Sequence, residues 1–320
     1  MLIESSDQVK LHSDRQEQLQ ESSKYITAFL KSLEPNDAYN VNSCPTCENE
    51  STQFVFAKNG GEYSYCKNCE HVFLSKSLKA SHLIDFYTNY PTSSMDWHKN
   101  ESIFYSRIYN AGIEMINAYQ NGRDVLDIGC SSGMFLSIVQ EQGFSGFGVE
   151  PNTKEASHAK NHGINVLGKT ITDIPRNQKF DVITMWDVLE HINSPGNFVK
   201  SLKKYLKPGG VVFVQIPTCD SLAARIMREK SNMFDGIEHL TLFSKKSLDI
   251  CFENAGFSSK RTKTIITESF ALKNYLSYES DPYLPSNNNN CESIEELIDF
   301  DGIEEKLFGY KIQACYRLES

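Results

Sequence analysis

Long apolar runs and an excess of positive charge are both missing from this 320-residue sequence. No stretch approaches the roughly 20 consecutive apolar residues that cross a bilayer, and the polar N-terminus has no apolar core of a signal peptide. We therefore expect a cytoplasmic protein. The net charge of −9 disfavours a nucleic-acid partner, because phosphate backbones are bound by basic surfaces.

The composition is otherwise ordinary for a soluble globular protein of one or two domains, with 40% hydrophobic and 23% charged residues. Low complexity is confined to the stretch PSNNNN, and no internal repeat is visible. The fold class must therefore be inferred from motifs and from the alternation of apolar patterns.

Four of the nine cysteines form two pairs, CPTC at 44–47 and CKNC at 66–69, separated by eighteen residues. Each C-x-x-C lets two thiolates converge from one tight turn, and two such turns complete a tetrahedral S4 site. The alternative is two redox or incidental pairs. We predict a structural zinc ion without an open coordination position, and expect His71 to be an ordinary neighbour. The predicted ligands are Cys44, Cys47, Cys66 and Cys69.

From residue 121 to about 265, short β-rich runs alternate with helical patterns, which is typical of a parallel sheet with crossover helices. The predicted strands are RDVLDIG, FSGFGVE, INVLG, FDVITMWD and GVVFVQIP. The final run YKIQACYRL alternates as a half-exposed strand does. The predicted units are an N-terminal helical segment (1–40), a zinc-ribbon module (41–75), connecting helices (76–120) and an α/β domain (121–320) with an insertion at 268–307.

The segment VLDIGCSSGMFL (125–136) reads as a strand, a turn of small residues and the start of a helix. Gly129 and Gly133 allow close approach of the backbone to a ligand, and the helix N-terminus offers free N–H groups. The next strand ends in GVEP, where Glu150 can accept hydrogen bonds from both hydroxyls of a ribose. The turn lacks the third spaced glycine of a dinucleotide fingerprint, so a dehydrogenase is disfavoured.

With FDVITMWDVLEHI and LKPGG following in order, this region resembles the Rossmann-like S-adenosylmethionine (SAM)-dependent methyltransferases. The resemblance implies an α/β fold with a seven-stranded sheet of order 3-2-1-4-5-7-6, and SAM as cofactor. Ser131 stands where many members have a glycine, and serine is small enough for the turn. The residues expected at the cofactor are Asp127, Gly129, Cys130, Ser131, Gly133, Glu150, Pro151, Ile171 and Trp186.

Two histidines are candidates for the base that removes a proton from the methyl acceptor. His191 follows the predicted fourth strand, whose carboxyl end also delivers Trp186, Asp187 and Glu190; it could instead only fix the turn there. His239 lies in FDGIEHLTLFS and could instead be a packed, satisfied residue. We expect His239 to be the base, oriented by Glu238, with His191 as second choice.

The zinc module, a Y-x-x-Y…SS stretch, the core and FDGIEHLTLFS together resemble the deoxysugar C-methyltransferases. The resemblance implies roles for Glu238, His239, His191 and Tyr90, and places the aromatic stretch 86–109 at the acceptor wall. Two departures stand out: Gly236-Ile237 replaces the family's Tyr-His, and its large C-terminal domain is absent.

We therefore expect O- or C-methylation of a small polar acceptor, sugar-like by preference. The alternatives are a ribosomal-RNA base methyltransferase with a zinc motif, a protein methyltransferase and a non-catalytic SAM-binding scaffold. Methylation of a nucleobase amine typically uses N/D-P-P-Y at the exit of the fourth strand, where WDVLEH stands here.

Overall fold

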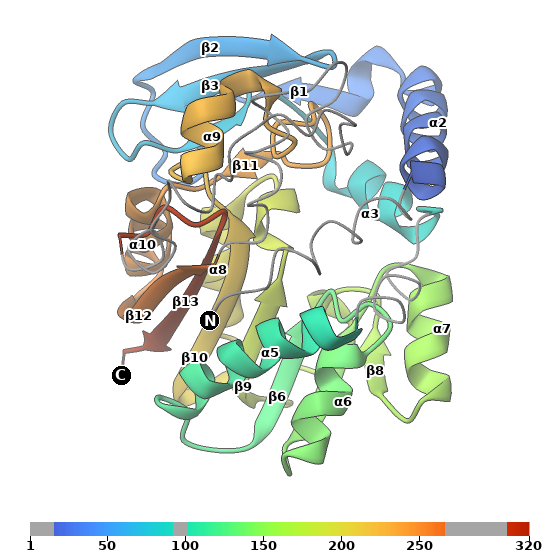
Figure 1. Cartoon of the computed structure of the whole chain (residues 1–320), viewed down its shortest axis with the longest axis vertical. Coiled ribbons are helices and arrows are strands. Elements are labelled where there is room, and N and C mark those ends of the chain that lie inside the picture. Colours follow the sequence, from blue (N-terminus) through green and yellow to red (C-terminus); the bar gives the residue numbers. More distant parts are fainter. Residues whose placement is uncertain (1–15, 92–101, 266–305, 320) are drawn as a thin grey trace, which may run out of the picture.

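The computed structural model describes residues 16–91, 102–265 and 306–319. Its centre is a seven-stranded mixed sheet of order β12-β13-β10-β9-β6-β7-β8 (Figure 1). Strands β6 to β10 pair in parallel, whereas β13 is antiparallel to both of its neighbours. The α/β class and the seven-stranded sheet are thus confirmed. The strands are β6 (Asp124–Ile128), β7 (Ser145–Val149), β8 (Asn165–Gly168), β9 (Phe180–Trp186), β10 (Leu206–Pro217), β12 (Phe257–Ile265) and β13 (Lys311–Leu318).

The central strands are continuous apolar runs because helices cover the sheet on both faces. Along β10, Val211 and Phe213 pack in one hydrophobic cluster, while Val212 and Val214 pack in another. This alternation follows the two-residue period of a strand. One face is covered by α5 (Ser102–Asn117), α6 (Met134–Glu141) and α7 (Thr153–Asn161), and the other by α8 (Pro195–Leu202) and α10 (Lys245–Asn254).

A second sheet, of order β11-β4-β3-β2, carries Cys66 at the end of one strand and lies next to the other three paired cysteines, at one end of the molecule (Figure 1). It consists of β2 (Thr52–Lys58), β3 (Gly61–Cys66), β4 (Val72–Leu74) and β11 (Thr241–Leu242). The two-residue β11 comes from the α/β part of the chain and pairs antiparallel with β4. The region predicted as a zinc module therefore shares a sheet with the segment that carries His239.

Most of the remaining elements pack near this second sheet, whereas the 3-10 helix Ile171–Asp173 lies beside β8. Tyr25 and Phe29 of α2 pack on Phe86 of α3, with ring centroids 5.3 and 4.9 Å apart. These elements are α2 (Gln16–Ser32), β1 (Ala38–Asn40), β5 (Lys76–Leu78), α3 (Ala80–Thr88), α9 (Leu222–Met227) and the short 3-10 helices Pro35–Asp37, Ile171–Asp173, Leu189–His191 and Arg228–Lys230.

Nearly all of the predicted insertion at 268–307 lies outside the described residues. In the part of the chain that the structure does describe, none of the helices combines the length and apolarity of a membrane span.

Candidate functional site

The turn between β6 and α6 adopts the backbone conformation that the glycine pattern predicts. Gly129 and Gly133 have φ of 73° and 86°, and Ser131 also has a positive φ of 51°. A Cβ on Gly129 would lie 2.7 Å from Cγ2 of Val188, so a larger residue does not fit there. Gly133 caps α6 without a side-chain acceptor, which leaves backbone N–H groups for a ligand.

Two buried carboxyl groups lie next to this turn. Glu150 accepts the Ser131 N–H (2.8 Å) on one oxygen and the Asn152 N–H (2.7 Å) on the other. Burial raises the pKa of Glu150 to about 7, against these hydrogen bonds, which lower it. Burial also raises the pKa of Asp127 to about 8, although Thr184 donates a 2.6 Å hydrogen bond to it. Each Glu150 oxygen retains a lone pair, so a ribose diol fits this acceptor pair.

The other side chains predicted at the cofactor pack against neighbouring protein residues. Cys130 is buried with its Sγ against Gly148, and Ile171 is part of a core cluster. The Trp186 ring packs 4.8 Å from Tyr109 and 4.6 Å from Phe213. Contact of these three side chains with a cofactor stays a prediction, as it does for half-buried Pro151.

The two candidate bases, distant in sequence, lie side by side in the structure. The 3-10 turn after β9 carries His191, the loop before β11 carries His239, and their ring centroids are 5.0 Å apart. Side-chain nitrogen or oxygen atoms of Glu190, His191 and His239 lie within 4.8 Å of one another. We call these three residues the acid–base cluster.

The hydrogen bonds of His191 define its tautomer. Its Nδ1 lies 2.8 Å from the Glu238 carbonyl oxygen and 2.8 Å from the Tyr87 hydroxyl oxygen. Because a carbonyl can only accept, Nδ1 carries the proton and Nε2 holds a free lone pair. Burial, and then the neighbouring His239, lower the pKa of His191 to about 4, so this ring is neutral at pH 7.

His239 is also protonated on Nδ1 but carries the opposite pKa shift. Its Nδ1 lies 2.8 Å from the Met233 carbonyl oxygen and 2.9 Å from Oδ2 of Asp235. Burial acts to lower the pKa of His239, but the Asp235 carboxylate, with Glu190 and the Met233 carbonyl, outweighs it and raises the pKa to about 10. The ring is therefore an imidazolium at pH 7 in this state.

The expectation that Glu238 orients His239 is corrected by the structure, because Asp235 makes that contact. Side chains of adjacent residues such as Glu238 and His239 point in different directions, whereas the turn of the loop brings the Asp235 carboxylate next to the ring of His239, four residues later. Burial and Asp235 raise the pKa of Glu238 to about 7, while a hydrogen bond from Tyr90 lowers it. The predicted residues Glu238 and Tyr90 thus contact each other beside the acid–base cluster.

Asp235 was not predicted as a site residue, although an acid four residues before His239 is visible in the sequence.

Glu190 was predicted to reach the site, but its environment could not be inferred from the sequence. It is 1% exposed, and neither carboxyl oxygen has a hydrogen-bond partner among the described residues. Burial and Asp187 raise its pKa to about 8, and His239 lowers it. A buried, unpaired carboxyl beside two histidines is typical of a functional site.

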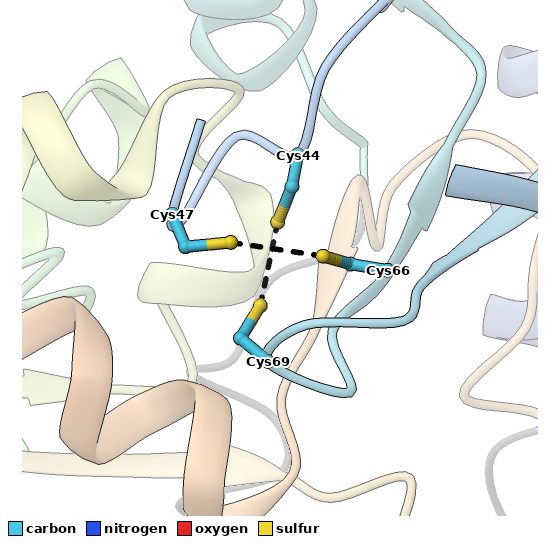
Figure 2. A group of neighbouring side chains, drawn as sticks. All are labelled: Cys44, Cys47, Cys66 and Cys69. Atoms are coloured by element: carbon cyan, nitrogen blue, oxygen red, sulfur yellow. Dashed lines mark hydrogen bonds between the residues drawn. The ribbon is translucent and has the colours of Figure 1, made fainter. Parts of the chain in front are cut away.

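The four paired cysteines converge as predicted (Figure 2). Sγ of Cys44 lies 3.5 Å from that of Cys69, and Sγ of Cys47 lies 3.6 Å from that of Cys66. A tetrahedron of Zn–S bonds of about 2.3 Å places its sulfurs about 3.8 Å apart, so these thiols fit a zinc ion. The hydrogen bond between Cys44 and Cys69 lowers the pKa of the first thiol and raises that of the second, because the two buried groups share one proton. His71 is buried against Phe243, with ring centroids 4.6 Å apart.

Comparison with known proteins finds similarity to methyltransferases in the α/β part of the chain. Residues 104–259 match a family described as a methyltransferase domain. The chain shares 35% identity over 104 residues with a ubiquinone biosynthesis O-methyltransferase of Actinobacillus pleuropneumoniae serotype 7, and 30% over 111 residues with that of Rickettsia canadensis. These alignments cover 29% and 32% of this chain, and 44% and 47% of the relatives. The chain thus spans less than half the length of the curated relatives it matches.

Solved structures agree on the fold. A chain of the Haloferax volcanii complex between the Trm112 methyltransferase activator and a methyltransferase aligns with a TM-score of 0.52 at 14% identity, over 74% of this chain and 98% of that one. Magnesium protoporphyrin IX methyltransferase of Synechocystis aligns with a TM-score of 0.50 at 12% identity, over 75% of this chain and all of that one. The α/β part of this chain therefore has the fold of class I methyltransferases, and residues 104–259 are similar to a methyltransferase domain.

Proposed function

We propose that this protein transfers a methyl group from SAM to a small hydroxylated acceptor, sugar-like by preference, with His239 as base. The observation that carries the proposal is the acid–base cluster at the carboxyl end of β9, where ligands of open α/β sheets bind. The loop that carries Glu190 and His191 touches the cofactor turn, because the Val188 side chain lies directly against Gly129. The acceptor and the cofactor would therefore meet at this point.

The residues around the glycine turn fit SAM. The Glu150 carboxylate would hold the ribose, and Gly129, Ser131 and Gly133 would allow the methionine end to approach the backbone. When bound, SAM supplies an electrophilic methyl group on a sulfonium. The protein must then hold the acceptor in line with that methyl and accept the hydroxyl proton.

The two histidines support different parts of this task. Asp235 makes His239 the stronger base, which acts through its neutral fraction and uses Nε2, since Nδ1–H is held by Met233 and Asp235. His191 is neutral at pH 7, and its Nε2 can accept a hydrogen bond from the acceptor hydroxyl. Together they give one strong base and one neutral acceptor that positions the hydroxyl group.

An oxygen acceptor is supported by the names of the relatives, which describe O-methylation. The net charge of −9 speaks against RNA. We regard the cysteine site as a structural zinc centre, because four protein ligands leave no position open for a substrate. The predicted division into an N-terminal helix, zinc module, connecting helices and methyltransferase domain is part of the same proposal.

The proposal is tested by incubating the protein with methyl-labelled SAM and separate panels of nucleotide sugars, other small hydroxylated metabolites and ribosomal RNA. We expect label in a small hydroxylated molecule, and loss of label transfer in His239→Gln with SAM binding retained. Label found only in RNA would refute the acceptor class. Full turnover in His239→Gln would refute the base.

A further inference from the structure

The tip of the β2–β3 hairpin, which belongs to the cysteine module, lies against the loop 231–239 that carries His239. Three of its side chains bond to the backbone of this loop. Lys58 Nζ donates to the Ser231 carbonyl (2.9 Å), and Asn59 Nδ2 donates to the Asp235 carbonyl (3.1 Å). The Tyr63 hydroxyl accepts the N–H of Gly236 (2.8 Å).

The two backbones also touch directly. A Cβ on Gly61 would lie 2.4 Å from the Gly236 carbonyl oxygen, and a Cβ on Gly236 would lie 2.5 Å from the Lys58 carbonyl oxygen. Gly236 has a φ of 90°, which disfavours any other residue. Phe234 packs beside this contact, with ring centroids 4.9 Å from Phe56 and 5.4 Å from Tyr63. The hairpin therefore fixes the loop by both packing and hydrogen bonds.

Asp235 connects the hairpin contact to the ring of His239. Its Oδ1 accepts the backbone N–H groups of Ile237 (2.8 Å), Glu238 (2.7 Å) and His239 (3.2 Å). Its Oδ2 contacts Nδ1 of the His239 ring at 2.9 Å. The residue whose carbonyl Asn59 holds is thus the residue that shapes the turn and orients the ring.

The same sheet also holds the other end of the loop. The N–H of Leu74 donates to the carbonyl of Leu240 (2.9 Å), the residue after His239, and β11 begins at the next residue. His239 is therefore bracketed by two attachments to the cysteine module, one at β2–β3 and one at β4. The residues that fit SAM lie instead in the turn between β6 and α6 and directly after β7.

We propose that the cysteine module is a positioning element for methyl transfer, in which Lys58, Asn59 and Tyr63 hold His239 next to His191. The inference rests on the proposed function insofar as His239 acts in catalysis, but the positioning itself can be measured without turnover. The module acts through Asp235 and does not contact the reacting atoms. Its loss would therefore affect the placement and protonation of His239 more than the affinity for SAM.

The test uses the full chain with Asn59→Ala, Tyr63→Phe and the double variant, and compares them with Glu62→Ala. Glu62 is an exposed residue of the same hairpin whose side chain is not part of the contact, so it serves as the matched control. The His239 ring is followed by NMR across pH and is assigned from the spectrum of His239→Gln. The groups that face this ring are Asp235, Glu190, Glu238 and His191.

In the double variant we expect the His239 titration midpoint to move down by about one pH unit or more, towards the ordinary value near 6.5. We expect SAM affinity to stay within about twofold and kcat to fall about tenfold or more, with smaller effects in the single variants. Glu62→Ala should match wild type. An unchanged His239 titration in a folded double variant would overturn the positioning role, and so would an equal shift in Glu62→Ala.

If the double variant does not fold, the single variants carry the test through the same titration. If wild type shows no methyl transfer but the titration shifts as expected, the proposed function fails and the positioning role stands. If kcat falls while the His239 titration does not move, the hairpin acts on turnover by another route and the inference is wrong.

Discussion

The contact between Asp235 and His239 predicts a specific pH dependence of turnover. The structure raises the pKa of His239 to about 10. Compared with an ordinary value near 6.5, this corresponds to roughly 5 kcal/mol in favour of the imidazolium. If His239 is the base, only its neutral form accepts a proton, so kcat should rise with pH towards about 10.

The perturbation is Asp235→Asn, which removes the negative charge but keeps an oxygen that can accept the N–H groups of residues 237–239. Burial of the ring then acts to lower the pKa of His239 without this carboxylate to oppose it. We expect the rise in kcat to move down by about two pH units or more, with a lower plateau because a weaker base is a poorer catalyst.

The assay is kcat at saturating SAM and acceptor between pH 5 and about 10.5, with His191→Asn as the comparison. The His191 variant should lose rate but keep the wild-type rise. A wild-type profile that is flat above about pH 5 would assign the base to His191, whose pKa is about 4. A profile unchanged by Asp235→Asn would refute the coupling of Asp235 to His239.

The same ion pair predicts a stability effect. The folded-state pKa of His239 lies above the unfolded value, so its contribution is fully present below about pH 6.5 and is lost as pH rises through about 10. The side chains of the pair are 23% and 22% exposed, so solvent screening reduces the contribution of this ion pair to the free energy of unfolding. Asp235→Asn should lower the free energy of unfolding by about 2 kcal/mol at pH 7 and by less above pH 10, as measured by denaturant titration.

Three further predictions concern the cofactor turn and the cysteine site. Metal analysis should find about one zinc ion per chain in wild type and far less in Cys69→Ser. The control Cys219→Ser should keep the wild-type zinc content. Equal zinc in all three proteins would contradict the four-cysteine zinc site. Glu150→Gln should weaken SAM binding by about 1–3 kcal/mol in calorimetry, because a carboxylate accepts the ribose hydroxyls better than an amide does, and its zinc content should not change. Gly129→Ala should lower stability or SAM affinity by about 1–3 kcal/mol, since its Cβ meets Val188 at a positive φ, and normal values of both would show that the turn can relax.

Some features could be predicted because they depend on residues that are close in sequence. The C-x-x-C pairs form local turns, so their spacing alone indicated the four-sulfur site. Apolar runs predicted the central strands, since a strand buried on both faces needs no polar alternation. The glycine turn and Glu150 were likewise recognisable from a strand, a turn and a helix start in sequence order.

Other features depend on partners that only the tertiary structure brings together. The two-residue β11 is too short to leave a pattern, so its pairing with β4 could not be predicted, and neither could the contact between the hairpin and the His239 loop. Motif reading placed Glu238 beside His239 as its orienting acid, whereas the folded loop gives that contact to Asp235.

The sequence by itself thus predicted the α/β fold class, the four cysteines that converge and the two histidines that lie side by side. The protonation states of these histidines were decided by tertiary structure. Burial among distant residues lowers one pKa, and a carboxylate held in place by the cysteine module raises the other. The physical reason is that a pKa depends on desolvation and on charges in space, and neither is encoded in local periodicity.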